Sequence, residues 1–160
     1  MKQNYFELFK LPVDFKIDEA DLTARHRAII TQIHPDKFTD KSAVEQRVAL
    51  QWATFANEAF DVLKSPIRRA QYLTQLQAPE LATESARVTL PPAFLMQQME
   101  WRELLEDGAV ESVRAEVAQA HTDALANLAK NCAAQDWAQV QVNVAECQFI
   151  ENFIKQLPTD

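Results

Sequence analysis

His34 and Asp36 are the polar side chains whose setting points most clearly to a role, because only Pro35 separates them between two amphipathic segments. Pro35 lacks an N–H and biases His34 away from the helical region, so the helix before it should end at about His34. A carboxylate on such a turn can make charge-assisted contacts with a partner protein. The sequence therefore predicts a polar tripeptide at the tip of an antiparallel helical hairpin.

Other residue patterns that would indicate catalysis or metal binding are missing from the sequence. It contains no Gly-rich phosphate loop, no paired metal ligands and no triad-like spacing. Cys132 and Cys147 lie in helical patterns without a CxxC spacing, and we interpret them as small buried side chains. His121 lies on an apolar stripe and is interpreted as a core or boundary histidine. We therefore expect no enzyme activity, no catalytic residue, no metal and no cofactor.

The apolar residues of the N-terminal half recur at the spacing of helices that face a core. A short helix is expected over residues 4–9, and the hairpin helices should begin after caps at Asp18 and at Asp40 or Ser42. Ser65-Pro66 should open a further helix over residues 66–75. The stripes expected to face the core are Leu22, His26, Ile29, Ile30 and Ile33 in the first hairpin helix, and Val44, Val48, Trp52, Phe55, Ala59 and Leu63 in the second.

The C-terminal half predicts three helices joined by short turns, over residues 92–107, 109–131 and 136–156. Gly108 should end the first of them, and such connections are typical of an antiparallel bundle. The stripes expected to face the core are Val110, Val113, Val117, His121, Ala124 and Leu128 in the second helix, and Trp137, Val140, Val144, Cys147 and Ile154 in the third. The predicted fold class is all-α, with domains at residues 1–76 and 92–160 and a connecting segment at 77–91.

Charge is distributed unevenly over the 160 residues, whose formal net charge is −7. Residues 1–79 carry 11 basic and 10 acidic side chains, whereas residues 80–160 carry 5 and 13. The acidic half argues against nucleic acid as a ligand, because phosphate binding needs a basic surface. No apolar run reaches the length of a membrane span, and no secretory signal is visible at the N-terminus. We therefore expect a cytoplasmic monomer with no membrane contact.

The predicted helix over residues 92–107 has two apolar faces. Phe94, Trp101 and Leu105 share the first, which suffices to dock the helix on its neighbours. Leu95, Met96 and Met99 lie on the other side, beside the acidic residues Glu100, Glu103 and Asp107. A small bundle cannot bury both faces, so the second should either hold a partner or pack against the N-terminal domain.

The tripeptide and its surroundings resemble the J-domain family, which stimulates ATP hydrolysis by DnaK-type chaperones. The matching segments are Tyr5 to Phe9, His34 to Asp36, Asn57 to Phe60 and Arg68 to Leu73. The resemblance implies that His34, Pro35 and Asp36 bind a chaperone. It implies the same for a basic cluster formed by Arg25, Arg27, Lys37 and Lys41, which is otherwise an ordinary solvated surface. Arg25 and Arg27 are about 200° apart on a helix, so they do not share one face.

The forms His34-Pro35-Asp36-Lys37-Phe38 and Phe94 to Leu105 more closely resemble the HscB family of J-proteins, which serves iron–sulfur cluster assembly. That resemblance spans nearly the whole chain. It implies an HscA-type DnaK-family chaperone and an IscU-type scaffold as partners. It also implies that the scaffold binds Leu95, Met96, Met99, Glu100, Glu103 and Asp107, with Phe149 as an exposed contact from the last helix.

Two other interpretations of the sequence remain open. The chain could be a J-protein with a different client, which would keep the chaperone partner and lose the scaffold. It could instead be a helical adaptor in which the tripeptide occurs by chance, since short motifs carry that risk.

Overall fold

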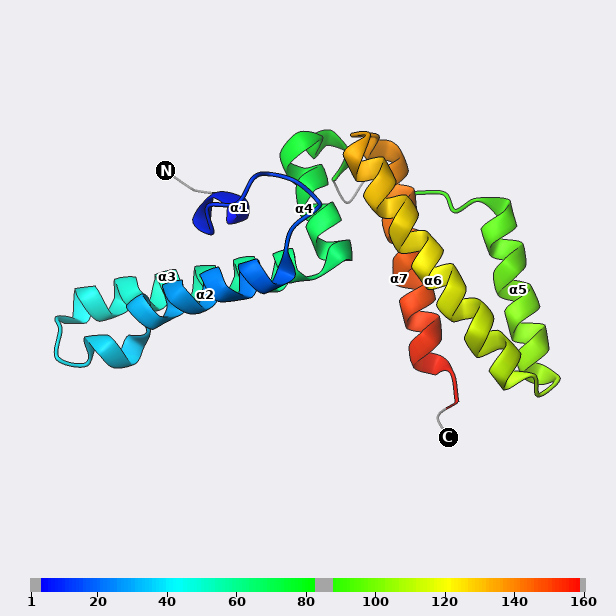
Figure 1. Ribbon diagram of the computed structural model, residues 1–160, viewed down its shortest axis with the longest axis horizontal. Coiled ribbons are helices and arrows are strands. Elements are labelled where there is room, and N and C mark those ends of the chain that lie inside the picture. The colour runs from blue at the N-terminus through cyan, green and yellow to red at the C-terminus, as the bar shows by residue number, and fades with distance from the viewer. Residues whose placement is uncertain (1–3, 83–87, 159–160) are drawn as a thin grey trace. The chain divides into compact units, whose positions relative to one another are not determined.

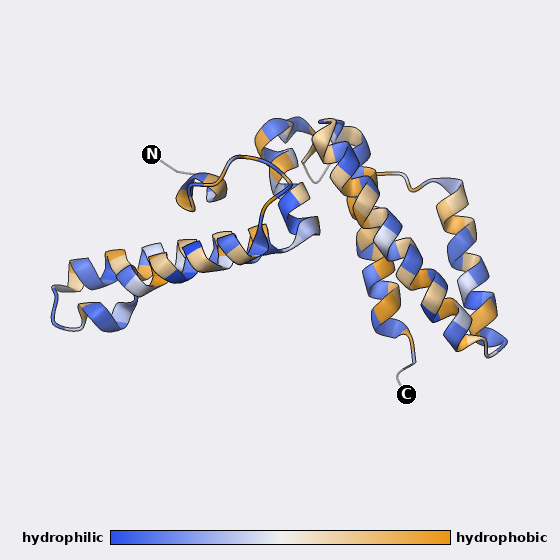
Figure 2. Cartoon of the chain, in the orientation of Figure 1, coloured by the Kyte–Doolittle hydropathy of each residue, from blue (hydrophilic) through white to orange (hydrophobic). Residues whose placement is uncertain are grey.

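The computed structural model describes residues 4–82 and 88–158, and within these ranges every regular element is a helix (Figure 1). The predicted all-α fold class is confirmed. Hydrophobic and hydrophilic residues are interspersed along the helices (Figure 2). Within the described ranges, no helix combines the length and the apolar composition needed to cross a membrane.

Two compact units make up the chain, Met1–Arg69 and Ala70–Asp160, and the division falls inside α4 (Pro66–Gln77). The limits expected from the sequence, at residues 1–76, 77–91 and 92–160, stay a prediction. Residues 1–3, 83–87 and 159–160 of those segments lie outside the described ranges.

The first unit contains α1 (Tyr5–Leu8), α2 (Glu19–Ile33), the short 3-10 helix η1 (Pro35–Phe38) and α3 (Ala43–Lys64). The caps expected from the sequence are present. Asp18 accepts hydrogen bonds from the backbone N–H groups of Ala20 and Asp21, and Ser42 accepts one from Glu45. These bonds satisfy donors that have no partner inside the helix, which fixes where α2 and α3 begin.

The buried face of α3 agrees only in part with the predicted one. Val44, Val48 and Trp52 were expected to face the core, but between 45% and 63% of each is exposed. Ala59 and Leu63 are buried as predicted, and Ala49, Ala53 and Ala56, which were not predicted, complete the buried face. Because alanine leaves room for close approach of two helices, α3 packs on its alanine face and turns its bulkier residues outward.

Arg69, near the start of α4, is a buried cation that sequence reasoning did not identify. Its Nη1 donates a hydrogen bond of 2.6 Å to the carbonyl oxygen of Leu63 at the end of α3. Its guanidinium also lies 4.6 Å from the ring centre of Phe15 in the α1–α2 connection. One side chain thus joins the α1–α2 connection to the α3–α4 junction.

The second unit contains the short 3-10 helix η2 (Pro79–Leu81) and the helices α5 (Pro92–Glu106), α6 (Val110–Ala133) and α7 (Trp137–Gln156). The last three form an antiparallel bundle (Figure 1). Gly108 has φ +85°, and the N–H of Ala109 bonds to the carbonyl oxygen of Leu104. This is a glycine-centred helix end, as the sequence predicted, because glycine adopts positive φ without steric cost.

The core of the bundle near α5 is aromatic and branched. It consists of buried side chains from all three helices, namely Phe94, Trp101, Val113, Val117, Ile150 and Phe153. The Trp101 and Phe153 rings lie 5.4 Å apart. Ile154 was expected on the buried stripe of α7, but it is exposed. Because α5 packs near this end of α7, the buried face is rotated toward Ile150 and Phe153.

Candidate functional site

The predicted tripeptide lies between α2 and α3. His34 has ψ 134°, the extended conformation that a following proline favours, and α2 accordingly ends at Ile33. Pro35 and Asp36 open η1, where the Nδ1 of His34 accepts a hydrogen bond of 3.2 Å from the N–H of Asp36. The side chain of Asp36 is 88% exposed and that of His34 is 50% exposed. Both polar groups can therefore reach a partner protein without any change in the packing of the unit.

Arg25 and Arg27 differ in what they contact. The Nε of Arg25 lies 3.0 Å from Asp21, and its Nη1 donates to the carbonyl oxygens of Phe9 and Lys10 at 2.9 and 3.3 Å. Arg25 thus holds the end of α1 against α2. Arg27 is exposed, as is Lys37 in η1. Arg25 therefore stabilises the packing of the first unit, whereas Arg27 and Lys37 face the solvent.

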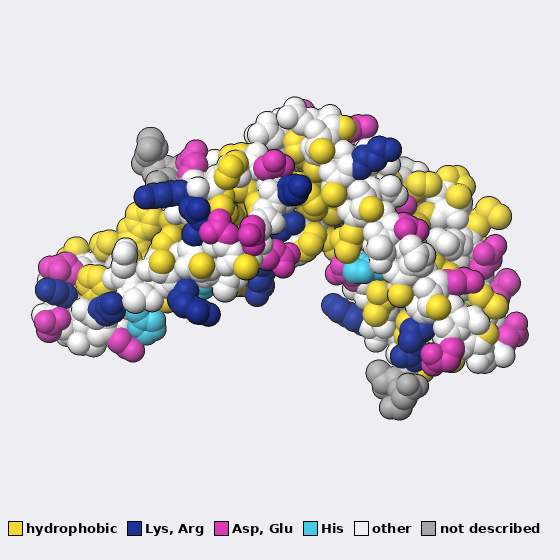
Figure 3. All heavy atoms as spheres, viewed as in Figure 1, with side chains coloured by type: hydrophobic (Ala, Val, Ile, Leu, Met, Phe, Trp, Pro, Cys, Tyr) yellow, Lys and Arg dark blue, Asp and Glu magenta, His cyan; other side chains and the backbone are white. Residues whose placement is uncertain are grey.

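Leu95, Met96 and Met99 form an exposed apolar patch on α5, which we call the α5 patch. Leu95 is 45% exposed, and Met96 and Met99 are each 63% exposed, whereas Trp101 on the opposite side of the helix is fully buried. The acidic residues Glu100, Glu103 and Asp107 are exposed beside it. In Figure 3, hydrophobic side chains gather over α5 with acidic side chains next to them. An exposed apolar patch with a charged rim is typical of a protein-binding surface.

Phe149 is half-buried, not the exposed contact expected from the sequence. Its ring lies 5.8 Å from that of Phe94 at 82°, an edge-to-face pair between α7 and α5. Because Phe94 belongs to the bundle core, part of Phe149 supports the packing of α5. Only the remaining part of its ring is open to a partner.

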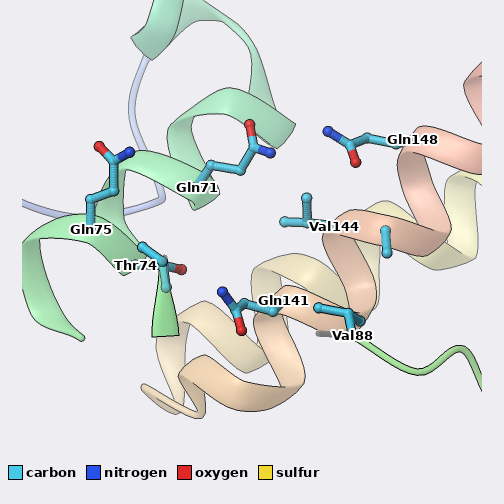
Figure 4. Close-up of a pocket in the computed structure, with 9 residues that line it drawn as sticks. Gln71, Thr74, Gln75, Val88, Gln141, Val144 and Gln148 are labelled. Atoms are coloured by element: carbon cyan, nitrogen blue, oxygen red, sulfur yellow. The ribbon is translucent and has the colours of Figure 1, made fainter. Parts of the chain in front are cut away.

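A hollow lined by polar residues lies between α4 and α7 and has a volume of about 340 Å³ (Figure 4). Gln71 and Thr74 come from α4, and Gln141 and Gln148 from α7; the amides of Gln71 and Gln148 point toward one another. Gln141 also donates a hydrogen bond to the carbonyl oxygen of Leu81. None of the site residues predicted from the sequence lines this hollow, so it belongs to neither surface described above.

The described residues contain no group of three or more histidine, cysteine or acidic side chains that could hold a metal ion. Cys132 and Cys147 are both buried, as the sequence predicted. Burial, and to a lesser extent the negative charges of Glu151 and Glu146, raise the pKa of Cys147 from 9.0 to about 12. A thiol held in this form is a poor nucleophile and a poor metal ligand.

Comparison with known proteins shows the family to which the chain belongs. Residues 90–157 match the family model described as the HSCB C-terminal oligomerisation domain. A protein of Burkholderia mallei named "Co-chaperone protein HscB homolog" is 43% identical over 134 residues, which cover 81% of this chain and 76% of that protein. The chain belongs to the HscB co-chaperone family. A member from Burkholderia multivorans is 49% identical over 109 residues, although that alignment covers only 62% of the relative's length.

Solved structures of the HscB family have the same fold. "Chaperone HscB from Vibrio cholerae" matches with a TM-score of 0.83 at 32% identity and covers 97% of this chain and 95% of its own. Human co-chaperone protein HscB matches with a TM-score of 0.87 at 22% identity and covers 98% of this chain and 81% of its own. The helical hairpin and the three-helix bundle are thus those of an HscB-type fold.

Proposed function

We propose that this chain is a J-domain co-chaperone of iron–sulfur cluster assembly, as its membership of the HscB family suggests. In this proposal, the hairpin stimulates the ATPase of an HscA-type DnaK-family chaperone, and the bundle delivers an IscU-type scaffold to that chaperone. The observation that carries the proposal is the α5 patch, because an HscB-type bundle here leaves Leu95, Met96 and Met99 uncovered.

His34, Pro35 and Asp36 act together in the chaperone contact. The Asp36 carboxylate, which is almost wholly exposed, makes a charge-assisted hydrogen bond to the chaperone. His34 holds the backbone of the turn through its bond to the N–H of Asp36. Arg27 and Lys37 supply positive charge that steers association with an acidic surface.

The scaffold contact is apolar at its centre and acidic at its rim. Binding buries the side chains of Leu95, Met96 and Met99 from water, and the flexible methionine side chains can adapt to the shape of a partner. Glu100, Glu103 and Asp107 select a partner with basic residues around its apolar surface. The chain performs no reaction itself and holds no cofactor, and we propose that it acts as a cytoplasmic monomer until it binds.

A calorimetric titration with an IscU-type scaffold tests this assignment. The double variant Leu95→Ala, Met96→Ala should weaken binding by about tenfold or more, because it removes two central apolar contacts. The matched control is Val44→Ala, Val48→Ala, which truncates two exposed apolar residues of the first unit and should bind as the wild type does. Unchanged binding by the α5 double variant would contradict the assignment and favour a different client.

A further inference from the structure

An open groove lies beside the N-terminal half of α5, lined by residues of α5, α6 and α7. The groove consists of two adjoining hollows of about 500 and 360 Å³, which share the lining residues Phe94, Gln97 and Glu146. Ile150 of α7 and Ala120 and Ala124 of α6 form part of the lining of the second hollow, whose other residues are mostly polar. We call this feature the α5–α7 groove.

The α5–α7 groove is continuous with the α5 patch. Met96 and Glu100 line its first hollow, and both also belong to the surface proposed to bind the scaffold. Glu146, which sequence reasoning did not single out, stands on the opposite wall. It precedes Phe149 by three residues on α7, and this spacing places both on one side of that helix.

The ionisable residues that line the groove are all acidic, namely Glu100, Glu116, Asp123 and Glu146. Three of them accept hydrogen bonds from neutral donors: Trp101 donates to Glu116 at 3.2 Å, Gln119 to Asp123 at 2.9 Å, and Asn143 to Glu146 at 3.2 Å. Within residues 4–82 and 88–158, none of the four forms an ion pair. Their negative charges are therefore uncompensated in the free protein, and a cation in the groove would lower their mutual repulsion.

We propose that the α5–α7 groove receives a lysine or arginine side chain of the same scaffold that covers the α5 patch. The inference rests on the proposed function and extends its binding surface from the α5 patch to Glu146 of α7. A long basic side chain matches the groove, because its aliphatic part can lie against the exposed Met96 while its charge meets Glu146. The partner must therefore present a basic residue beside its apolar contact surface.

The variant Glu146→Gln tests the groove, with binding of an IscU-type scaffold measured by calorimetry at low and at high salt. The variant should bind about three- to fivefold more weakly at low salt, and salt should weaken its binding less than that of the wild type. Glu58→Gln, an exposed position on α3 with the same charge change, is the control and should bind as the wild type does.

The outcomes separate this inference from the proposed function. If Glu146→Gln binds the scaffold with the affinity and salt dependence of the wild type, the proposed role of the groove would be overturned. Loss of binding in Leu95→Ala, Met96→Ala would still support the α5 patch as a scaffold-binding surface. If Glu146→Gln binds the scaffold more weakly while Leu95→Ala, Met96→Ala binds it normally, the role of the groove would be supported and that of the α5 patch contradicted. Equal weakening by Glu58→Gln would also overturn the groove, because net charge alone would then explain the effect.

Discussion

At the scale of single residues, polar side chains that look alike in the sequence have different surroundings in the structure. Arg25 and Arg27 both appeared to belong to a basic binding cluster. In the structure, Arg25 bonds to two carbonyl oxygens at the end of α1, and those partners lie 15 and 16 residues earlier in the chain. Local periodicity carries no information about contacts over such separations. The turn at the tripeptide could be predicted from the sequence, because a proline restricts the backbone conformation of the residue before it.

The two arginines should therefore respond differently to substitution. Arg25→Ala should lower the free energy of unfolding by about 1–2 kcal/mol, because it leaves backbone acceptors without their donor. Arg27→Ala should change that free energy by less than about 0.5 kcal/mol but weaken stimulation of the chaperone. Urea unfolding followed by circular dichroism measures both, and equal stability of the two variants would contradict the assigned roles.

The pKa of Cys147 predicts a loss of stability in alkaline solution. Its folded-state pKa of about 12 lies above the unfolded value of 9.0, so the thiol stabilises the fold fully below pH 9. That contribution is lost as the pH rises from 9 to 12, by about 1.4 kcal/mol at pH 10. Urea titrations at pH 8 and pH 10 should show a fall in stability that is smaller by this amount in Cys147→Ala. An identical fall in both proteins would contradict the prediction.

At the scale of elements, the positions and ends of the helices were predicted more accurately from the sequence than their buried faces were. Asp18, Ser42 and Gly108 mark helix ends through bonds to their own neighbours, and all three act as expected. On α3, Ala59 and Leu63 are buried as predicted, whereas Val44, Val48 and Trp52 were wrongly expected to be buried. The error arose because valine and tryptophan are more hydrophobic than alanine and therefore dominate an apolar pattern. Close approach of α2 and α3 outweighs that preference, and it is a property of the helix pair, not of α3 alone.

Enlarging the alanine face of α3 should therefore be costly. Ala56→Leu should lower the free energy of unfolding by about 1–3 kcal/mol, because Ala56 is fully buried and α2 would have to move away. Val44→Leu, at a position that is 63% exposed, should change it by less than about 0.5 kcal/mol. Thermal or urea unfolding of both variants gives the comparison. Similar effects at the two positions would mean that α3 packs on the face predicted from the sequence.

At the scale of the whole molecule, the two proposed surfaces lie on different units with separate cores. The tripeptide belongs to the first unit, and the α5 patch and α5–α7 groove belong to the second. The α5 patch could be predicted from the sequence, because α5 carries more apolar residues than its packing within the bundle requires. The groove could not be predicted, because three helices contribute to it. A change at either surface should leave the packing of the other unit intact.

The central claim is that one chain couples a chaperone ATPase to a scaffold. It is tested most directly by ATP turnover of an HscA-type chaperone, measured with this protein in the presence and absence of an IscU-type scaffold. The account predicts that protein and scaffold together stimulate turnover more than the sum of their separate effects. Asp36→Ala should abolish stimulation, whereas Leu95→Ala, Met96→Ala should lose only the part that depends on the scaffold. Stimulation that does not depend on the scaffold, or that survives Asp36→Ala, would contradict it.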